Sequence, residues 1–345
     1  MPHPEIDNHS PFVFAPLHVS DKDGRPLLVL AVKATYDIRN DSVVERAEEQ
    51  LSLKLSGEAW GKPGQSSFKY EPEACWVKPA TDVVLVAHAW APRHNTRILD
   101  IAFGVGPVAK KARIFGERKW LALKVPEAST PEPFETLPLV YERAFGGWDR
   151  SHADPMKHTF DERNPFGRGF LAKGGRVDGL ALPNIEDPLA PMRTPADKPA
   201  PVGFGFSCAQ WQPRAAFAGT YDEAWSAERA PLLPENFDRR FLNGASTGLV
   251  APGYLRGDEP VIGTGVTKSG RLAFKLPGQA PPVFRVRLRS RDDEAPPAHL
   301  DTVIVNTDDN KLILIWRAEV VLDGGPHDVL SIGVDAPTSP LESAE

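Results

Sequence analysis

Proline and glycine are so frequent in this chain that long helices are excluded over most of its length. The sequence holds 35 prolines and 28 glycines among 345 residues, well above the roughly 12% that the two residues reach together in average proteins. Both residues disfavour helix interiors and favour turns. Because 41% of the residues are still hydrophobic, a core can close, and we predict a folded, loop-rich protein.

Short apolar runs rich in β-branched residues lie between the turns at both ends of the chain. The strand-rich segments are 8–126, which contains LLVLAV and DVVLV, and 254–335, which contains VFRVRL and KLILIW. Short strands separated by turn residues predict a mainly β fold, either a β-sandwich or barrel-like sheets. The turn Asp308-Asp309-Asn310 predicts a hairpin between the last two long strands.

The middle of the chain predicts long ordered loops rather than a linker. Residues 127–218 are interrupted by proline and glycine, yet they keep many aromatic residues, which flexible linkers lack. We therefore expect these loops to pack over the sheets, and we expect residues 1–345 to form a single domain.

The segment 219–244 predicts two short helices. Thr220 and Glu223 have the spacing of a capping box at the start of the first helix. Pro234 suits the first turn of the second helix, and Asn243-Gly244 would end it in the left-handed conformation.

Charge and cysteine content limit the classes of function. The net charge is −6, so we expect no nucleic-acid partner. The two cysteines, Cys75 and Cys208, lie far apart and form no CxxC motif, which argues against a disulfide framework and favours a reducing compartment. No apolar run approaches the roughly 20 residues that span a bilayer, and we expect a cytoplasmic protein with no membrane insertion.

Common catalytic signatures are absent from the sequence, and one loop offers the main alternative. Asp149, His152, Asp154 and His158 fall within ten residues of one another, and such residue types serve as acid, base or metal ligands in metal-assisted hydrolases. The spacing of the two histidines fits neither one helical turn nor one strand face. We therefore expect no metal, no cofactor and no catalysis, and we interpret these side chains as partners of local backbone groups.

The most regular charge pattern is a run of alternating arginines near the C-terminus. A strand projects alternate residues to one side, so an extended chain here would present one cationic stripe made of Arg285, Arg287, Arg289 and Arg291. Such a stripe either protects a sheet edge from pairing or binds an acidic partner. We take it as the candidate partner-binding surface.

Several motifs occur in a fixed order along the chain: LPLVYERAFGGWD, RNPFGRGF, GTYDEAWSAERAPLLPENFDRRFLNGA and LDTVIVNTDDNKLILIWRAEV. In these motifs the chain resembles the type VI secretion-associated adaptor and chaperone family, formerly known only as a domain of unknown function. Genes of that family lie beside those of spike (VgrG-type) and tip (PAAR-type) proteins. The resemblance covers about residues 8–322 and is most specific over 219–245. Asn236 departs from it, where an acidic residue is expected.

The resemblance implies a non-catalytic adaptor that holds an effector, its PAAR-type tip domain or the VgrG-type spike in the cytosol. It implies no catalytic residue. An adaptor needs a broad surface with aromatic and arginine anchors. We expect the aromatic and polar signature residues to serve the architecture more than the partner. They are Arg143, Trp148, Asn164, Arg168, Tyr221, Asp222, Trp225 and Arg229. A third reading is a β-sandwich that binds carbohydrate through exposed tryptophans.

Overall fold

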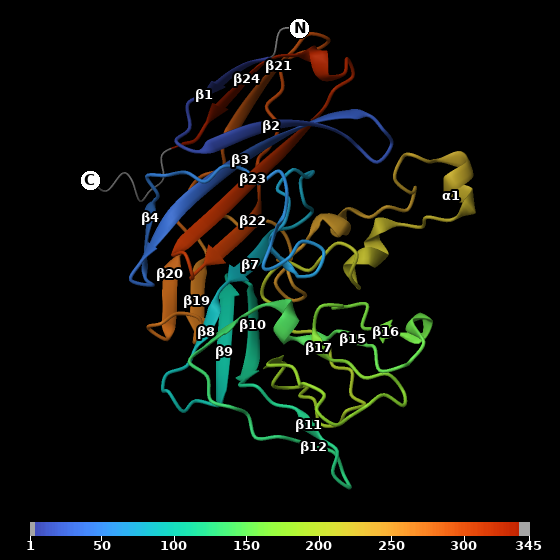
Figure 1. Ribbon diagram of the computed structural model, residues 1–345. Helices are drawn as coiled ribbons and strands as arrows, with labels where there is room; N and C mark the ends of the chain where they lie inside the picture. Colours follow the sequence, from blue (N-terminus) through green and yellow to red (C-terminus); the bar gives the residue numbers. More distant parts are fainter. Residues whose placement is uncertain (1–3, 338–345) are drawn as a thin grey trace.

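The computed structural model describes residues 4–337, and this part of the chain is built mainly from strands. Strands account for 37% of it and helical turns for 7%, which confirms the predicted mainly β class. Three larger sheets follow one another along an elongated molecule (Figure 1). None of the sheets within 4–337 closes into a barrel, so the sandwich-like alternative describes the fold.

The central sheet joins the two ends of the chain. It has the order β2 (Val13–Ser20), β3 (Pro26–Arg39), β23 (Lys311–Val321), β22 (His299–Asn306) and β7 (Asp82–Val86), with β4 (Val43–Arg46) paired to β3. Strands β3 and β23 are antiparallel over eleven residue pairs, from Lys311 opposite Asp37 to Val321 opposite Leu27. The predicted hairpin between β22 and β23 is present.

The two flanking sheets also combine distant segments. The five-stranded sheet has the order β18 (Ile185–Glu186), β10 (Val108–Phe115), β9 (Ile98–Val105), β19 (Pro260–Thr264) and β20 (Arg271–Lys275). The three-stranded sheet consists of β1 (Glu5–Asn8), β24 (Val329–Asp335) and β21 (Val283–Leu288).

One apolar core connects all three sheets. Leu30 of β3, Phe103 of β9, Phe284 of β21 and Ile332 of β24 belong to the same cluster of buried side chains. Such continuity is what a single folding unit requires. The expectation of one domain stays a prediction.

Charged side chains are buried beside this core, each with a partner. Lys33 Nζ lies 2.8 Å from Glu73, and Lys78 Nζ lies 2.7 Å from Asp82. The guanidinium of Arg317, only 1% exposed, pairs with buried Asp301. Pairing offsets part of the cost of removing these charges from water.

Short strand pairs and a small second core order the loops of the central segment and of the region before it. The pairs are β5 (Glu58–Ala59) with β6 (Phe68–Tyr70), β8 (His88–Trp90) with β13 (Thr136–Pro138), β11 (Trp120–Leu121) with β12 (Glu127–Ala128), β14 (Phe145–Gly146) with β17 (Arg168–Gly169), and β15 (Trp148–Asp149) with β16 (Thr159–Phe160). Trp120, Phe145, Phe170, Leu182 and Met192 form the second core. The middle of the chain is therefore packed, as its aromatic content predicts.

The prediction of two short helices is half right. One α-helix is present, α1 (Glu223–Glu228), and its N-cap is Asp222, whose carboxylate accepts a hydrogen bond from Trp225 N, rather than Thr220. The second segment is a 3-10 turn, η4 (Arg239–Leu242). The other 3-10 turns are η1 (Tyr141–Arg143), η2 (Pro155–Lys157), η3 (Arg214–Ala218) and η5 (Pro326–Asp328).

The predicted left-handed helix end at Asn243 is wrong, and a tertiary contact explains why. Asn243 is extended, with φ −73°. Its amide donates to Asp82 Oδ1 at 2.9 Å, and Gly244 N donates to the other oxygen of the same carboxylate at 2.8 Å. Buried Asp82 thus fixes the backbone in a conformation that local preference does not select.

Candidate functional site

A large cavity lies among the central loops, beside the hairpin formed by β15 and β16. Its volume is about 890 Å³, within the range of sites that bind ligands or peptide segments. It is lined by residues of four loop segments: Gly64, Gln65, Trp148, Arg150, Phe160, Glu162, Pro165, Phe166, Gln210, Trp211 and Gln212. We call this the aromatic groove.

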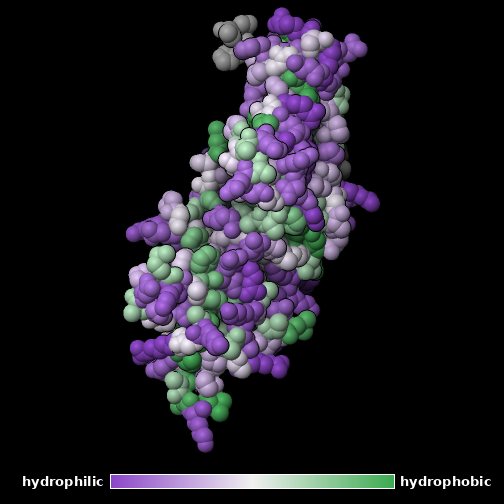
Figure 2. All heavy atoms as spheres, turned by 90° about the vertical axis from the view of Figure 1, so that its right-hand side faces the viewer, coloured by the Kyte–Doolittle hydropathy of each residue, from purple (hydrophilic) through white to green (hydrophobic). Residues whose placement is uncertain are grey.

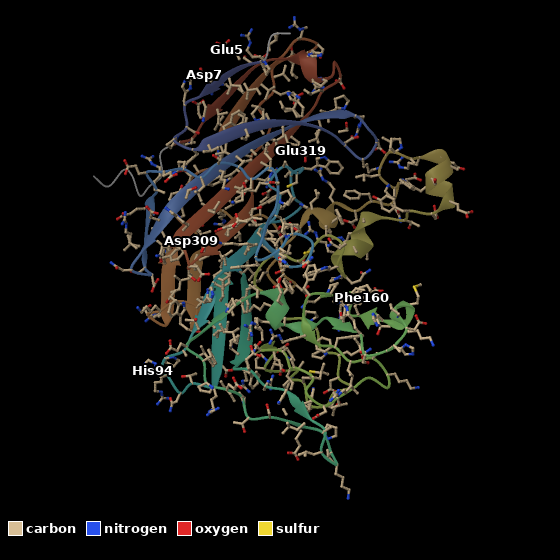
Figure 3. The ribbon with its side chains drawn as sticks, in the orientation of Figure 1. Glu5, Asp7, His94, Phe160, Asp309 and Glu319 are labelled. Carbon is tan, nitrogen blue, oxygen red and sulfur yellow. The ribbon has the colours of Figure 1, made fainter. Side chains whose placement is uncertain are left out.

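An exposed aromatic pair forms one wall of the groove. Trp148 and Phe160 are directly opposite each other in the β15–β16 pairing, and their ring centroids are 4.3 Å apart. The two side chains are 42% and 39% exposed, and Figure 3 labels Phe160 at this hairpin. The Arg150 guanidinium lies 5.1 Å from the centre of the Trp148 ring, close enough for a cation–π contact.

Another part of the lining is anchored in the protein interior. The Trp211 ring is buried and packs edge-on against Tyr141 and Phe166, with centroids 5.1 Å and 5.5 Å away. Gln65, Gln210 and Gln212 add amide groups that both donate and accept hydrogen bonds. The groove therefore combines apolar ring faces with polar groups at its rim.

Buried polar side chains hold the loops that carry the groove. Asn164 donates from Nδ2 to the carbonyls of Tyr141 at 2.7 Å and Phe145 at 2.9 Å. Arg143 and Arg168 both pair with Glu117. These contacts satisfy backbone and charge in irregular parts of the chain, and the architectural role of Arg143, Asn164 and Arg168 stays a prediction.

Trp148 departs from that expectation. Its ring is not enclosed by the core but stands on the surface of the hairpin. Met156, in the turn between β15 and β16, is 91% exposed. Tryptophan, phenylalanine, methionine and arginine at one exposed place have the composition of a protein-binding surface.

Three of the side chains of the acid, base and metal-ligand alternative bind local backbone groups. The His152 Nδ1 accepts from Asp154 N at 2.9 Å, and His158 Nε2 lies 3.0 Å from the His152 carbonyl. The Asp149 carboxylate accepts from Ser151 N and Ala172 N, both at 2.9 Å. Within residues 4–337, no group of three or more His, Cys, Asp or Glu side chains is arranged to hold a metal ion.

Sequence reasoning missed one constellation that has the geometry of a nucleophile and base. Lys110 Nζ donates to Ser246 Oγ at 2.8 Å, and Tyr141 OH donates to the same oxygen at 3.0 Å. Burial lowers the pKa of Lys110 to about 7. However, Ser246 is 1% exposed, and Lys110 also donates to the carbonyls of Gly203 and Thr247. A substrate cannot reach this hydroxyl, so the group is a structural crosslink.

The strand that carries the arginine run ends earlier than the alternating pattern predicts. Strand β21 ends at Leu288, with a shift in register after Arg287, so Arg289 and Arg291 do not continue its face. Arg285 pairs with Asp335, and Arg291 lies 2.5 Å from both Glu294 and Asp323. These acidic neighbours neutralise much of the stripe, and its role in partner binding stays a prediction.

The helical arm, residues 213–243, projects from the body on the side of the molecule that also carries β15 and β16 (Figure 1). None of the residues of α1 is buried. Tyr221 packs edge-on against Trp225, whose Nε1 donates to Leu232 O at 2.9 Å, and Arg229 reaches Asp23 in the turn between β2 and β3 at 2.6 Å. Figure 2 shows this side of the molecule, where hydrophobic patches alternate with hydrophilic residues.

Asn236, the departure noted in the sequence, has a place in this arm. Its Oδ1 accepts from Thr220 N and its Nδ2 donates to Thr220 Oγ1, both at 3.0 Å. An acidic residue could make both contacts, with the Thr220 hydroxyl as the donor in the second.

The fold and site together define a mainly β protein with an aromatic, loop-built groove, and no helix in the described part of the chain is long and apolar enough to cross a membrane. The chain belongs to the family described as an uncharacterized protein conserved in bacteria (DUF2169), which matches residues 23–317. No curated protein and no solved structure matches the chain.

The sequence alone gives little indication of which residues line the groove. Trp148 and Phe160 were visible as aromatic residues of one loop, but Gln65 and Gln210 come from segments far away in the chain. Only the packing of the loops brings them to one cavity.

Proposed function

We propose that this protein is a non-catalytic adaptor or chaperone that binds a type VI secretion effector, or its PAAR-type tip domain, in the cytosol and assists its loading for delivery. The connection to type VI secretion rests on the sequence resemblance. The observation that carries the binding role is the exposed Trp148–Phe160 ring pair in the lining of the aromatic groove.

The groove is suited to a protein partner for energetic reasons. Aromatic and arginine side chains contribute most of the binding energy at interfaces, where a few anchors each account for about 2 kcal/mol or more. Because Trp148 and Phe160 are already packed against each other, little side-chain entropy is lost on binding. The buried Trp211 ring and the side-chain amides of Gln65, Gln210 and Gln212 complete the surface.

A binding measurement tests the site. The double variant Trp148→Ala, Phe160→Ala should bind the effector encoded beside this gene about 30-fold or more weakly, since about 2 kcal/mol is lost. Ile262→Ala, which truncates an exposed apolar side chain on β19 away from the groove, is the matched control. Equal affinity of the double variant and wild type would place the partner elsewhere.

The arginines can be tested in the same assay. If Arg285, Arg287, Arg289 and Arg291 guide association with an acidic partner, binding slows as salt shortens the Debye length from about 10 Å at 0.1 M to about 3 Å at 1 M. Replacing all four by glutamine should then weaken binding. An unchanged association rate would show that these arginines are not part of the interface.

The function itself is tested in the cell. Deleting the gene should abolish delivery of the effector while the secretion apparatus still fires. Unimpaired delivery in the deletion strain would contradict the adaptor role.

A further inference from the structure

A second cavity lies where the tips of the central and five-stranded sheets meet. Its volume is about 640 Å³. It is lined by residues from the β3–β4 turn, β8, β13, the β19–β20 loop and the β22–β23 turn: Ile38, Asn40, Asp41, His88, Trp90, Thr136, Thr267, Lys268, Thr307, Asp308 and Asn310. Figure 3 labels Asp309, which lies in the last of these turns. We call this the hairpin-tip cavity.

The cavity presents polar groups that the described protein does not use. The Trp90 indole N–H, His88 Nε2, Lys268 Nζ and the side-chain amides of Asn40 and Asn310 make no hydrogen bond to residues of the described chain. Asn40, Lys268 and Asn310 are exposed at the turns, and His88 and Trp90 are half-buried. These groups are therefore available to a ligand.

The backbone holds these groups in place before any ligand binds. Asp308 accepts from both His88 N at 3.0 Å and His88 Nδ1 at 2.9 Å, which orients the ring and leaves Nε2 facing outward. Asn40 and Asn310 occupy tight turns with φ of 51° and 53°. A preorganised site loses little entropy when it binds.

The balance of charge selects the class of ligand. Lys268 is offset by Asp41, and the His88 imidazole shares a hydrogen bond with the Asp308 carboxylate, so no single charge dominates the lining. Amides, hydroxyls and an imidazole both donate and accept hydrogen bonds, which matches hydroxyl groups. Trp90 adds one half-buried aromatic face.

We propose that the hairpin-tip cavity binds a neutral saccharide, with Trp90 against one sugar face and His88, Asn40 and Asn310 bonded to its hydroxyls. This site goes beyond the adaptor function and shares no residue with the aromatic groove.

Saturation-transfer NMR on the full chain tests the proposal, with maltose, cellobiose, lactose and N,N′-diacetylchitobiose as probes. At least one should bind saturably, and Trp90→Ala should weaken its binding about tenfold or more, which corresponds to about 1.4 kcal/mol. Asn40→Gly and Asn310→Gly remove only the amides, because glycine accepts the positive φ, and each should weaken binding in a protein that stays folded.

The control is Trp148→Ala, which should leave sugar binding unchanged even if it abolishes partner binding. This control separates failure of the saccharide site from failure of the proposed adaptor function. Absence of saturation transfer from all four sugars would overturn the saccharide site. Binding that persists in Trp90→Ala and Asn310→Gly would also overturn it, as would tighter binding of glucuronate or phosphate.

Discussion

Single charged residues inside the central sheet have the largest expected effect on stability. Arg317 of β23 donates to the Asp301 carboxylate and to the Glu73 carbonyl, the latter at 2.8 Å. Lys33, on the neighbouring β3, bonds to the Glu73 carboxylate. Buried charges of this kind are tolerated because each has a partner with good geometry.

We predict that Arg317→Met lowers the free energy of unfolding by about 3–5 kcal/mol, because Asp301 becomes a buried charge without its counter-ion. Urea denaturation measures the change. Adding Asp301→Leu to the variant removes the stranded charge and should restore part of the loss. A loss below about 1 kcal/mol would mean that water reaches Asp301.

The hydrogen bond between His88 and Asp308 makes the stability of the protein depend on pH. The hydrogen bond to Asp308 raises the pKa of His88 above its usual 6.5. The folded state therefore binds this proton more tightly than the unfolded state, so the pair stabilises the protein at pH below about 6.5 and the benefit is lost as pH rises through the folded pKa.

We accordingly expect Asp308→Asn to lower the melting temperature more at about pH 5.5 than at about pH 8.5. NMR titration of the His88 ring should show its pKa falling in the variant. An equal loss of melting temperature at both pH values would assign the effect to the backbone bond of Asp308 alone.

At the scale of elements, the helical arm is the least supported part of the fold. The residues of α1 have no buried side chain, and Trp225 is half-buried. The arm is tied down by hydrogen bonds from Trp225 and Arg229 and by the Asn236–Thr220 pair. Elements with few buried apolar contacts open locally at low free energy.

We predict that Trp225→Ala costs about 1–2 kcal/mol, less than the roughly 3–5 kcal/mol typical of a buried tryptophan. Hydrogen exchange should accelerate within 220–236 and stay unchanged in β3 and β23. Faster exchange throughout the central sheet would show that the arm supports the whole fold.

At the scale of the whole molecule, the sheets interleave distant segments. The five-stranded sheet takes β9 and β10 from before the proline-rich loop at 191–201, and β19 and β20 from after it. The central sheet pairs β3 with β23 in the same way. Neither half of the chain contains a complete sheet of its own among these two.

Limited proteolysis between 191 and 201 should therefore yield two fragments that remain associated and unfold together. Size-exclusion chromatography of the nicked protein, followed by thermal unfolding, measures this. Two stable fragments that separate under native conditions would contradict a single folding unit.

Local patterns in the sequence determined the strands, the β22–β23 hairpin and the ordered nature of the central loops. Apolar runs such as KLILIW are buried as strands because their side chains must leave water wherever the run is placed. The aromatic content of the loops has the same consequence, and it is satisfied by the small core around Trp120 and Phe145.

The tertiary structure alone decided the features that depend on distant partners. Asp82 overrides the left-handed end expected at Asn243, the register shift in β21 interrupts the arginine stripe, and the packing of separate loops brings Gln65 and Trp211 beside Trp148. Each outcome depends on the register and contacts between segments far apart in the chain, which residue spacing within one segment does not encode.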